Sequence, residues 1–244
     1  MIFSIIVPVF NEEKTILAIL NQLKNINFRK FKKEIIVVND GSTDNTKNLL
    51  DKNKDLYDVL FSNEKNEGKG SAVRLGLKNS SGEYVVFQDS DLEYDPIDLL
   101  KFEEVFLKFN ADGIIGSRFR YDKYTRSHSI LNKLGNYILT FVFNILYNTT
   151  FTDIYSCYFA FKKKLINSND ITTEGFTQHA EILSKVIKTG SKFYEVPINY
   201  NGRSFSEGKK IRYYHFFPVL AQIFIGKFKW KWKLILIFSF IFFF

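Results

Sequence analysis

Residues 84–93 read Tyr-Val-Val-Phe-Gln-Asp-Ser-Asp-Leu-Glu, an apolar run followed at once by an acidic turn. A short run of β-branched and aromatic residues is typical of a strand that is buried on both faces. Alternate side chains of an extended segment point the same way, so Asp89 and Asp91 can converge on one hard cation, with Glu93 as a third oxygen ligand. Because acidic turn residues are more often solvated caps, the neighbouring strands must decide between the two interpretations.

Four further apolar runs predict strands, at residues 2–7, 34–38, 57–61 and 113–117. Apolar residues at helical spacing lie between them, at residues 16–23, 44–54 and 70–77 and after Pro96. This alternation predicts an α/β fold, a mostly parallel sheet with helices on both faces. In such sheets ligands bind at the carboxyl ends of the strands.

Polar side chains follow two of these strands as well. Asn11 and Glu12 come after the first, and the segment Asp40-Gly-Ser-Thr-Asp44 comes after the second. We expect them at the same sheet edge as Asp89, although Asn11 and Asp44 are equally suited to cap helices. Lys69, between two glycines, is as well suited to contact a phosphate as to be a flexible surface lysine.

The second half of the chain is richer in phenylalanine. In residues 131–148 a polar residue recurs every fourth position, which fits a core helix and an interfacial helix equally well. Residues 216–224 form another apolar helix face, and residues 227–233 alternate lysine with aromatic residues, as in a lipid headgroup belt. We therefore predict C-terminal amphipathic interfacial helices and a basic, aromatic, membrane-associating tail at residues 213–244. Residues 234–244 are apolar but too short to span a bilayer by themselves, so we interpret them as either an in-plane anchor or the front end of a truncated span.

Charge and cysteine content limit the function classes. The formal net charge is +8, and residues 201–233 hold eight basic residues against one acidic residue. Such a segment favours an anionic membrane surface, a phosphorylated substrate or nucleic acid, but acidic strand ends argue against nucleic acid at the site. The single cysteine, Cys157, excludes an intrachain disulfide, and the N-terminus reads as a strand, so we expect a cytosolic enzyme body.

Five segments carry a family resemblance: Pro8-Val-Phe-Asn-Glu12, Asp40-Gly-Ser-Thr-Asp44, Asn66-x-Gly-Lys-Gly-x-Ala72, Asp89-Ser-Asp91 and Gly116-Ser-Arg118. In order and spacing they resemble the GT-A nucleotide-sugar glycosyltransferases of family 2, and most closely their dolichol-phosphate-mannose synthase group. The resemblance covers roughly residues 2–212 and extends to Thr152-Asp-Ile154, to Arg203 and to Gly208-Lys-Lys210. It implies one GT-A catalytic domain at residues 1–212, with a nucleotide-sugar half (1–120) and an acceptor half (121–212).

The resemblance also implies a role for each motif residue. The nucleotide-sugar site comprises Pro8, Val9, Asn11, Glu12, Asp40, Ser42, Lys69 and Asp89. Asp89, Asp91 and Glu93 bind Mg²⁺ or Mn²⁺, with Glu93 replacing the glutamine of some members. The acceptor phosphate contacts Arg118, Arg126, Arg203 and Lys209. The catalytic set is Asp89, Asp91, Arg118 and Arg203. Apart from the resemblance, Asp153 is suited to act as a base for a protonated acceptor, to orient a sugar hydroxyl or to cap the next helix, and we favour the cap.

The expected reaction is an inverting, metal-dependent sugar transfer from a nucleotide diphosphate sugar (GDP-mannose or a UDP-hexose) to polyprenyl phosphate, dolichyl or undecaprenyl, at the cytoplasmic face of a membrane. A lipid monophosphate is already anionic near neutral pH, so the site must supply positioning and charge neutralisation and not a base. Two alternatives stay open, transfer to a cell-surface glycan or glycolipid and a non-catalytic peripheral membrane module. A membrane-protein partner and a homo-oligomer are compatible with either.

Overall fold

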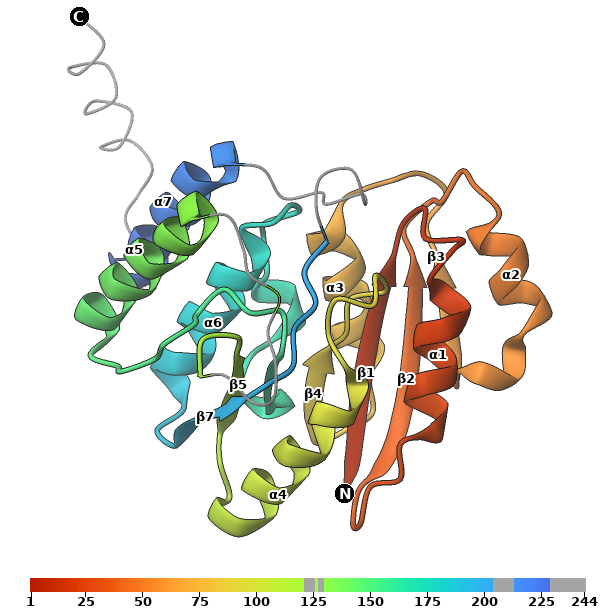
Figure 1. The fold of residues 1–244 in the computed structure, drawn as a ribbon, viewed down its shortest axis with the longest axis horizontal. Coiled ribbons are helices and arrows are strands. Elements are labelled where there is room, and N and C mark those ends of the chain that lie inside the picture. The colour runs from red at the N-terminus through yellow and green to blue at the C-terminus, as the bar shows by residue number, and fades with distance from the viewer. Residues whose placement is uncertain (121–125, 127–129, 204–212, 229–244) are drawn as a thin grey trace, which may run out of the picture.

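The computed structural model describes residues 1–120, 126, 130–203 and 213–228, and in this part seven strands form one sheet (Figure 1). The strand order is β3-β2-β1-β4-β6-β5-β7. The strands are β1 (Ile2–Val9), β2 (Lys32–Asn39), β3 (Val59–Ser62), β4 (Tyr84–Phe87), β5 (Gly113–Ser117), β6 (Phe159–Lys162) and β7 (Phe193–Pro197). Lys209, the segment 204–212 and residues 229–244 of the predicted tail lie outside the described residues.

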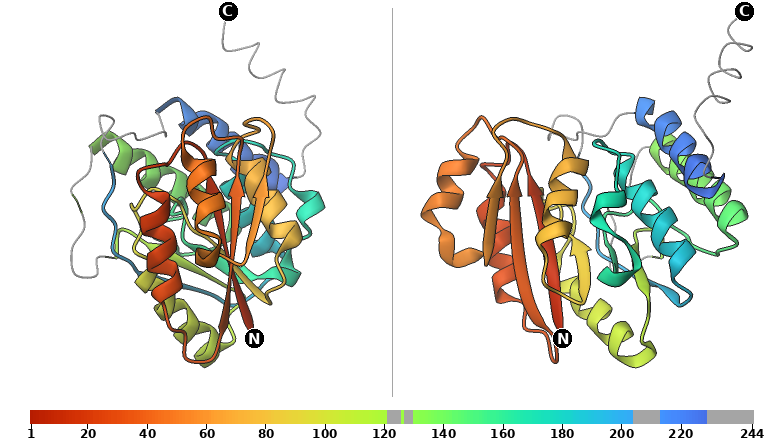
Figure 2. Two further views of the ribbon diagram at one scale, coloured as in Figure 1. Left: turned by 90° about the vertical axis from the view of Figure 1, so that its right-hand side faces the viewer. Right: turned by 180° about the vertical axis from the view of Figure 1, so that it is seen from behind.

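The first half of the sheet is parallel, as predicted. β1 pairs with β2 and β4, and β2 pairs with β3, all in parallel. The α-helices of this half are α1 (Ile16–Asn25), α2 (Thr46–Lys52), α3 (Lys69–Asn79) and α4 (Leu99–Phe109). Helices α1 and α4 lie on one face of the sheet, and α3 lies on the other with α6 (Gln178–Thr189) (Figures 1 and 2). The α/β architecture with helices on both faces is therefore confirmed.

The second half contains three elements that the sequence patterns did not predict. β6 inserts between β4 and β5 and is antiparallel to both, and β7 pairs with β5 in parallel. β6 takes up the end of an apolar run at residues 157–161 that is not predicted as a strand, and β7 is only partly buried, so its apolar pattern is weak. α6 follows Thr177, whose side chain makes no capping hydrogen bond, and no helix is predicted for this stretch.

The start of α1 corrects one expectation. Asn11 does not cap the helix, which begins at Ile16. Its backbone lies in the left-handed region with φ 52°, and its side chain accepts a 2.8 Å hydrogen bond from the Thr43 N–H. Asn11 therefore ties the loop after β1 to the loop after β2.

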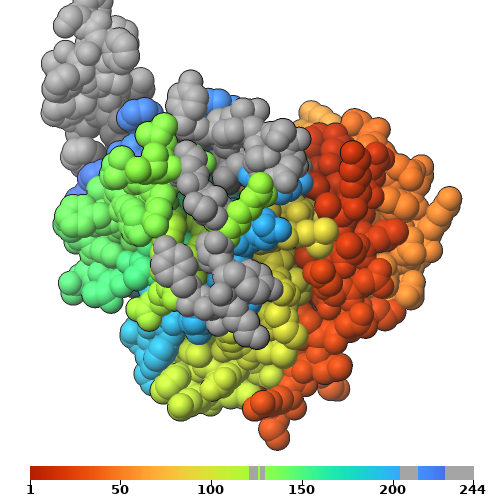
Figure 3. All heavy atoms as spheres, in the orientation of Figure 1, coloured from red at the N-terminus to blue at the C-terminus, as the bar shows by residue number. Residues whose placement is uncertain are grey.

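Helix α5 (Ile130–Tyr147) carries its polar stripe towards the protein. Asn136 and Thr140 are buried, and the Thr140 hydroxyl accepts a hydrogen bond from the Ile154 N–H. The opposite side exposes large apolar residues, namely Ile130, Leu131, Leu134, Tyr137, Ile138, Phe141 and Ile145. We call these seven residues the α5 apolar face. In Figure 3 the green surface of α5 lies at the side of the molecule away from α1 and α2.

Helix α7 (Phe216–Phe228) packs beside α5 (Figures 1 and 2). The hydroxyl of Tyr147 at the end of α5 donates a 3.0 Å hydrogen bond to the Ile223 carbonyl of α7. On α7, Phe217, Phe224 and Phe228 are exposed. Within the described ranges, no helix combines the length and apolarity needed to cross a bilayer.

Candidate active site

One large cavity lies at the carboxyl ends of β1, β2 and β4. It measures about 670 Å³ and is lined by side chains from both halves of the chain. Of the predicted site residues, ten line it: Pro8, Val9, Glu12, Asp40, Lys69, Asp89, Asp91, Glu93, Arg118 and Arg203. The prediction that separate strand ends meet at one edge of the sheet is thus seen directly.

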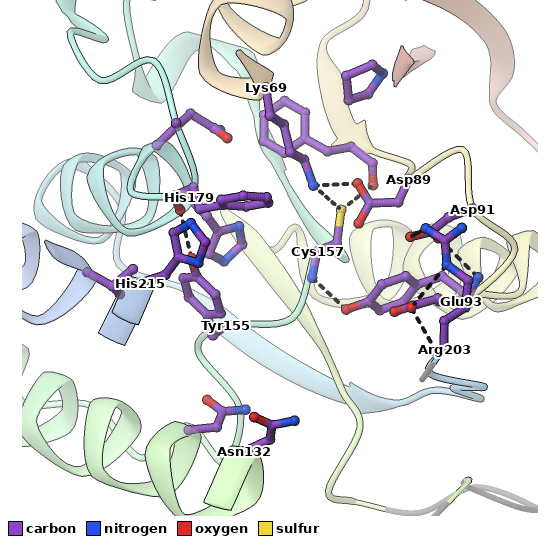
Figure 4. A pocket seen from close by; sticks show the side chains of 18 of the residues that line it. Lys69, Asp89, Asp91, Glu93, Asn132, Tyr155, Cys157, His179, Arg203 and His215 are labelled. Atoms are coloured by element: carbon purple, nitrogen blue, oxygen red, sulfur yellow. Dashed lines mark hydrogen bonds and ion pairs between the residues drawn. The ribbon is translucent and has the colours of Figure 1, made fainter. Parts of the chain in front are cut away.

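Lys69 and Asp89 form an ion pair inside the cavity (Figure 4). Lys69 is the first residue of α3, and the positive φ of 92° at Gly68 sets the turn before it. The ammonium also lies 3.8 Å from the Cys157 sulfur. Burial opposes the charge of both partners, but their mutual attraction prevails, raising the pKa of Lys69 and lowering that of Asp89.

Three other carboxylates surround Arg203. Its guanidinium lies 3.0 Å from Asp91, 3.3 Å from Glu12 and 3.5 Å from Glu93. The Tyr200 hydroxyl and the Arg203 N–H donate hydrogen bonds of 2.5 and 2.8 Å to the two oxygens of Glu93. Burial, together with the charges of Asp89 and Glu93, raises the pKa of Asp91 to about 7 despite Arg203. Negative charge is therefore only partly neutralised at Asp91.

Asp40 lies at the far end of the same edge and is almost fully buried. Its carboxylate accepts hydrogen bonds from the backbone N–H groups of Glu67 and Gly68, at 3.0 and 2.8 Å, and from the Asn63 amide at 2.8 Å. These bonds attach the loop before α3 to the end of β2. The Asn39 side chain points into its own turn and accepts a 3.2 Å hydrogen bond from the Ser42 N–H.

Arg118 pairs with Asp153, which is fully buried. Two guanidinium nitrogens donate to the two carboxylate oxygens at 2.7 and 2.9 Å, and the Asn136 amide adds a third bond at 2.7 Å. The expectation that Asp153 mainly caps a helix is wrong, because its oxygens are used by Arg118 and Asn136. The guanidinium also lies 5.1 Å from the centre of the Tyr200 ring.

The remaining predicted residues lie away from the cavity wall or beyond the described part of the chain. The Asn11 backbone N–H donates a 3.0 Å hydrogen bond to the Ser42 hydroxyl, which links the loops after β1 and β2. The Arg126 guanidinium donates a 2.9 Å hydrogen bond to the Gly202 carbonyl and is not among the lining residues. Lys209 lies outside the described residues.

The cavity also contains side chains that the sequence analysis missed. Tyr155, Gln178 and His179 line its wall, and Figure 4 shows His179 beside Tyr155. Cys157 follows the Thr152-Asp-Ile154 segment by three residues, but a lone cysteine and isolated histidines without metal-ligand spacing give no signal of a site. The pairing of β6 with β4 brings the Cys157 segment to the end of β4, where Asp89 lies.

The donor set suits a hard divalent cation. Oxygen ligands are what Mg²⁺ and Mn²⁺ prefer, and Mg²⁺ commonly uses one or two carboxylates together with substrate phosphates. Asp89 and Asp91 meet this requirement, and the raised pKa of Asp91 marks the charge that a cation would neutralise. Within the described residues, however, no three His, Cys, Asp or Glu side chains converge on one point. Glu93, predicted as the third ligand, is bonded to Tyr200 and Arg203.

Comparisons with known proteins agree with this geometry. Residues 4–169 match the family described as "Glycosyl transferase family 2". The chain is 30% identical over 200 residues to glycosyltransferase AglJ of Haloferax volcanii, covering 82% of this chain and 63% of the relative. It is 27% identical over 228 residues to the UDP-N-acetylglucosamine–dolichyl-phosphate N-acetylglucosaminyltransferase of Methanococcus voltae, covering 85% and 89% of the two chains.

Solved structures share the fold at low identity. The glucosyl-3-phosphoglycerate synthase of Mycobacterium tuberculosis, crystallised with Mn²⁺, UDP and glucosyl-3-phosphoglycerate, superposes with a TM-score of 0.69 at 19% identity, covering 92% of this chain and 79% of that one. S. aureus TarS 1-349 in complex with UDP-GlcNAc superposes with a TM-score of 0.61, also at 19% identity, covering 93% and 66%. These likenesses support a GT-A-like fold.

Proposed function

The chain belongs to glycosyltransferase family 2, and on this basis we propose that it transfers one sugar from a nucleotide diphosphate sugar to polyprenyl phosphate at the cytoplasmic face of a membrane. The observation that carries the proposal is the composition of the large cavity at the strand ends. Carboxylates from three strand ends, the partly buried Arg118 and the apolar residues Leu139 and Phe217 of α5 and α7 all line it. A charged donor site is therefore continuous with an apolar wall suited to a lipid.

The donor would occupy the end of the cavity near β1, β2 and β4. Asp89 and Asp91 would hold Mg²⁺ or Mn²⁺, which when bound supplies charge neutralisation to the leaving diphosphate. Lys69, already beside Asp89, lies where a second positive charge would face the same phosphates. Glu12 and Glu93 hold Arg203 within the site, next to Asp91.

Arg118 is the best placed described residue to receive the acceptor phosphate. Asp153 engages two of its nitrogens and fixes the plane of the guanidinium, while the residue still lines the cavity. A planar, preorganised arginine suits a phosphate oxygen pair. In the reaction, a lipid phosphate oxygen forms a bond to the anomeric carbon, and the carbon–oxygen bond to the diphosphate breaks with its electron pair leaving on the nucleotide. Attack opposite the leaving group inverts the anomeric centre.

The α5 apolar face supports a membrane location for the acceptor. A soluble surface helix normally exposes a polar face. α5 already buries Leu139 and Phe143 against the protein, and yet its exposed side carries large apolar residues such as Phe141 and Ile145. The relative from Methanococcus voltae is named as a dolichyl-phosphate N-acetylglucosaminyltransferase. Both observations favour a peripheral enzyme that rests on lipid with the α5 side.

The test uses the full chain with vesicles that contain dolichyl or undecaprenyl phosphate. Labelled UDP-glucose, UDP-N-acetylglucosamine and GDP-mannose are supplied with Mg²⁺ or Mn²⁺, and the expected product is a chloroform-extractable, mild-acid-labile sugar lipid. Vesicles containing the uncharged polyprenol serve as the control and should give none. Absence of an extractable product with every donor would overturn the proposal, and label on a glycan or diacylglycerol acceptor instead would establish the alternative transferase.

A further inference from the structure

The first turn of α6 presents two neutral polar side chains to the cavity. His179 and Gln178 both line it, and neither belongs to a predicted motif. The His179 ring is held on three sides. Its Nε2 lies 2.9 Å from the Ile154 carbonyl, and the rings of Tyr155 and Phe159 meet it edge to face with centroids 5.8 and 6.1 Å away.

The contact between His179 Nε2 and the Ile154 carbonyl decides which ring nitrogen can accept a hydrogen bond from a ligand. A carbonyl oxygen only accepts, so Nε2 carries the hydrogen and Nδ1 presents a lone pair. Within the described part of the chain, Nδ1 has no hydrogen-bond partner. Burial, assisted by the positive charges of Lys69 and Arg118, lowers the pKa of His179 to about 4. At neutral pH the imidazole is therefore an uncharged acceptor and not a cation that would bind phosphate.

Gln178 supplies the complementary group. The residue is only 2% exposed, and its amide nitrogen is buried without a hydrogen-bond partner among the described residues. Leaving a buried donor unpaired is unfavourable, so such groups in a cavity wall are commonly paired by a ligand or by water. Rotation about the last side-chain bond turns either end of the amide towards the cavity.

His179 lies near the groups that we propose for both phosphates. Two ion pairs, Lys69–Asp89 and Arg118–Asp153, both act electrostatically on the His179 imidazole. In Figure 4, His179 lies on one side of Cys157, and Asp91 and Arg203 lie on the other. A group held between the donor diphosphate and the acceptor phosphate would therefore face the start of α6.

Resting on the proposed function, we propose that Gln178 and His179 form the subsite that recognises the hydroxyl or amide groups of the donor sugar. His179 Nδ1 accepts a hydrogen bond from a sugar O–H or N–H, and the Gln178 amide donates one to a sugar oxygen. An uncharged acceptor and donor side by side suit a neutral polyol. They are specificity-determining residues, whereas the phosphates are bound by the charged groups described above.

The experiment compares each nucleotide sugar with its own nucleoside diphosphate. Equilibrium affinities of the full chain for UDP-glucose, UDP-N-acetylglucosamine and GDP-mannose are measured against those for UDP and GDP, with Mn²⁺ present. His179→Gln keeps a donor for the Ile154 carbonyl but removes the Nδ1 acceptor, and Gln178→Met removes the amide at similar volume. Each should weaken binding of the preferred nucleotide sugar about tenfold and leave binding of the nucleoside diphosphate unchanged.

Two controls separate recognition from folding. His179→Asn retains an acceptor near Nδ1 and should recover part of the sugar affinity, while Gln22→Met makes the glutamine change at an exposed position of α1 and should alter neither affinity. Equal weakening for the nucleotide sugar and the diphosphate, or no weakening, would overturn the subsite. If wild type binds none of the nucleotides, the proposed function itself fails, which is a distinct outcome.

Discussion

Arg118 and Asp153 are joined by two parallel hydrogen bonds of 2.7 and 2.9 Å, and the carboxylate is completely buried. Burial alone raises the pKa of Asp153, yet the guanidinium overrides it and the pKa lies below its usual value. Asp153 therefore stays ionised and holds Arg118 in one orientation. The pair couples the end of β5 to the segment before β6.

Replacing Asp153 with asparagine should destabilise the protein strongly. The substitution leaves the Arg118 charge buried without its counter-ion, and removing one partner of a buried pair costs about 3–5 kcal/mol. Urea unfolding of Asp153→Asn against wild type measures the loss. Asp55→Asn, which removes the partner of Lys24 in an exposed pair, should unfold like wild type. Equal unfolding midpoints for Asp153→Asn and Asp55→Asn would contradict this account.

His179 should make the folded protein less stable in mild acid. Its pKa is about 4 in the folded protein and about 6.5 when unfolded. Between these values the unfolded chain binds a proton that the folded chain does not, so stability falls as the pH falls from 6.5 towards 4. The loss amounts to about 2 kcal/mol at pH 5. Urea unfolding at pH 7 and pH 5 should show a smaller decrease in the free energy of unfolding for His179→Gln than for wild type. Equal decreases in the two proteins would refute the role of His179 in this pH dependence.

The first half of the fold and the core of the site could be predicted from the sequence because both depend on local patterns. The strand-end position of Asp40 and Asp89 follows from apolar runs that end in polar turns, and parallel strands bring such ends together. The half-buried β7 carries no comparable pattern. β6 is as short as β4, but its antiparallel placement beside β4 arises from packing between distant segments, which no local pattern encodes.

The sequence also does not predict which charged residues form ion pairs with one another. Nothing in the spacing of Arg118 and Asp153 indicates an ion pair, since they are 35 positions apart. Likewise, residues 131–148 fitted a core helix and an interfacial helix equally well. The structure resolves the direction of the polar stripe, because Asn136 donates to the buried Asp153 and so must face inwards.

The α5 apolar face should govern attachment to lipid. Phe141 and Ile145 are 66% and 65% exposed, so replacing both with serine should cost little stability. Each large apolar side chain gains about 1.5–3 kcal/mol on leaving water, so the double substitution should weaken partition onto vesicles at least about tenfold. Flotation with vesicles of mixed neutral and anionic lipid measures this. Ile97→Ser with Leu107→Ser, also at exposed positions but remote from α5, provides the matched control and should float like wild type. Equal flotation of the two double variants would exclude α5 as the lipid contact.

Asp91 should be needed for turnover and dispensable for folding. Burial and the neighbouring Asp89 and Glu93 oppose its charge, which is why its pKa is raised to about 7. Asp91→Asn removes this repulsion, and Arg203 keeps Glu12 and Glu93 as partners, so the unfolding free energy should stay level or rise. Sugar transfer should fall at least about a hundredfold.

Thermal stabilisation by Mn²⁺ and nucleotide distinguishes a metal-binding role of Asp91 from a purely structural one. Mn²⁺ with UDP or GDP should raise the unfolding temperature of wild type and of Glu104→Gln, an exposed acid on α4, but not that of Asp91→Asn. If Mn²⁺ and nucleotide protect Asp91→Asn as fully as wild type, Asp91 does not hold the ion. Its raised pKa would then reflect only burial and the neighbouring charges of Asp89 and Glu93.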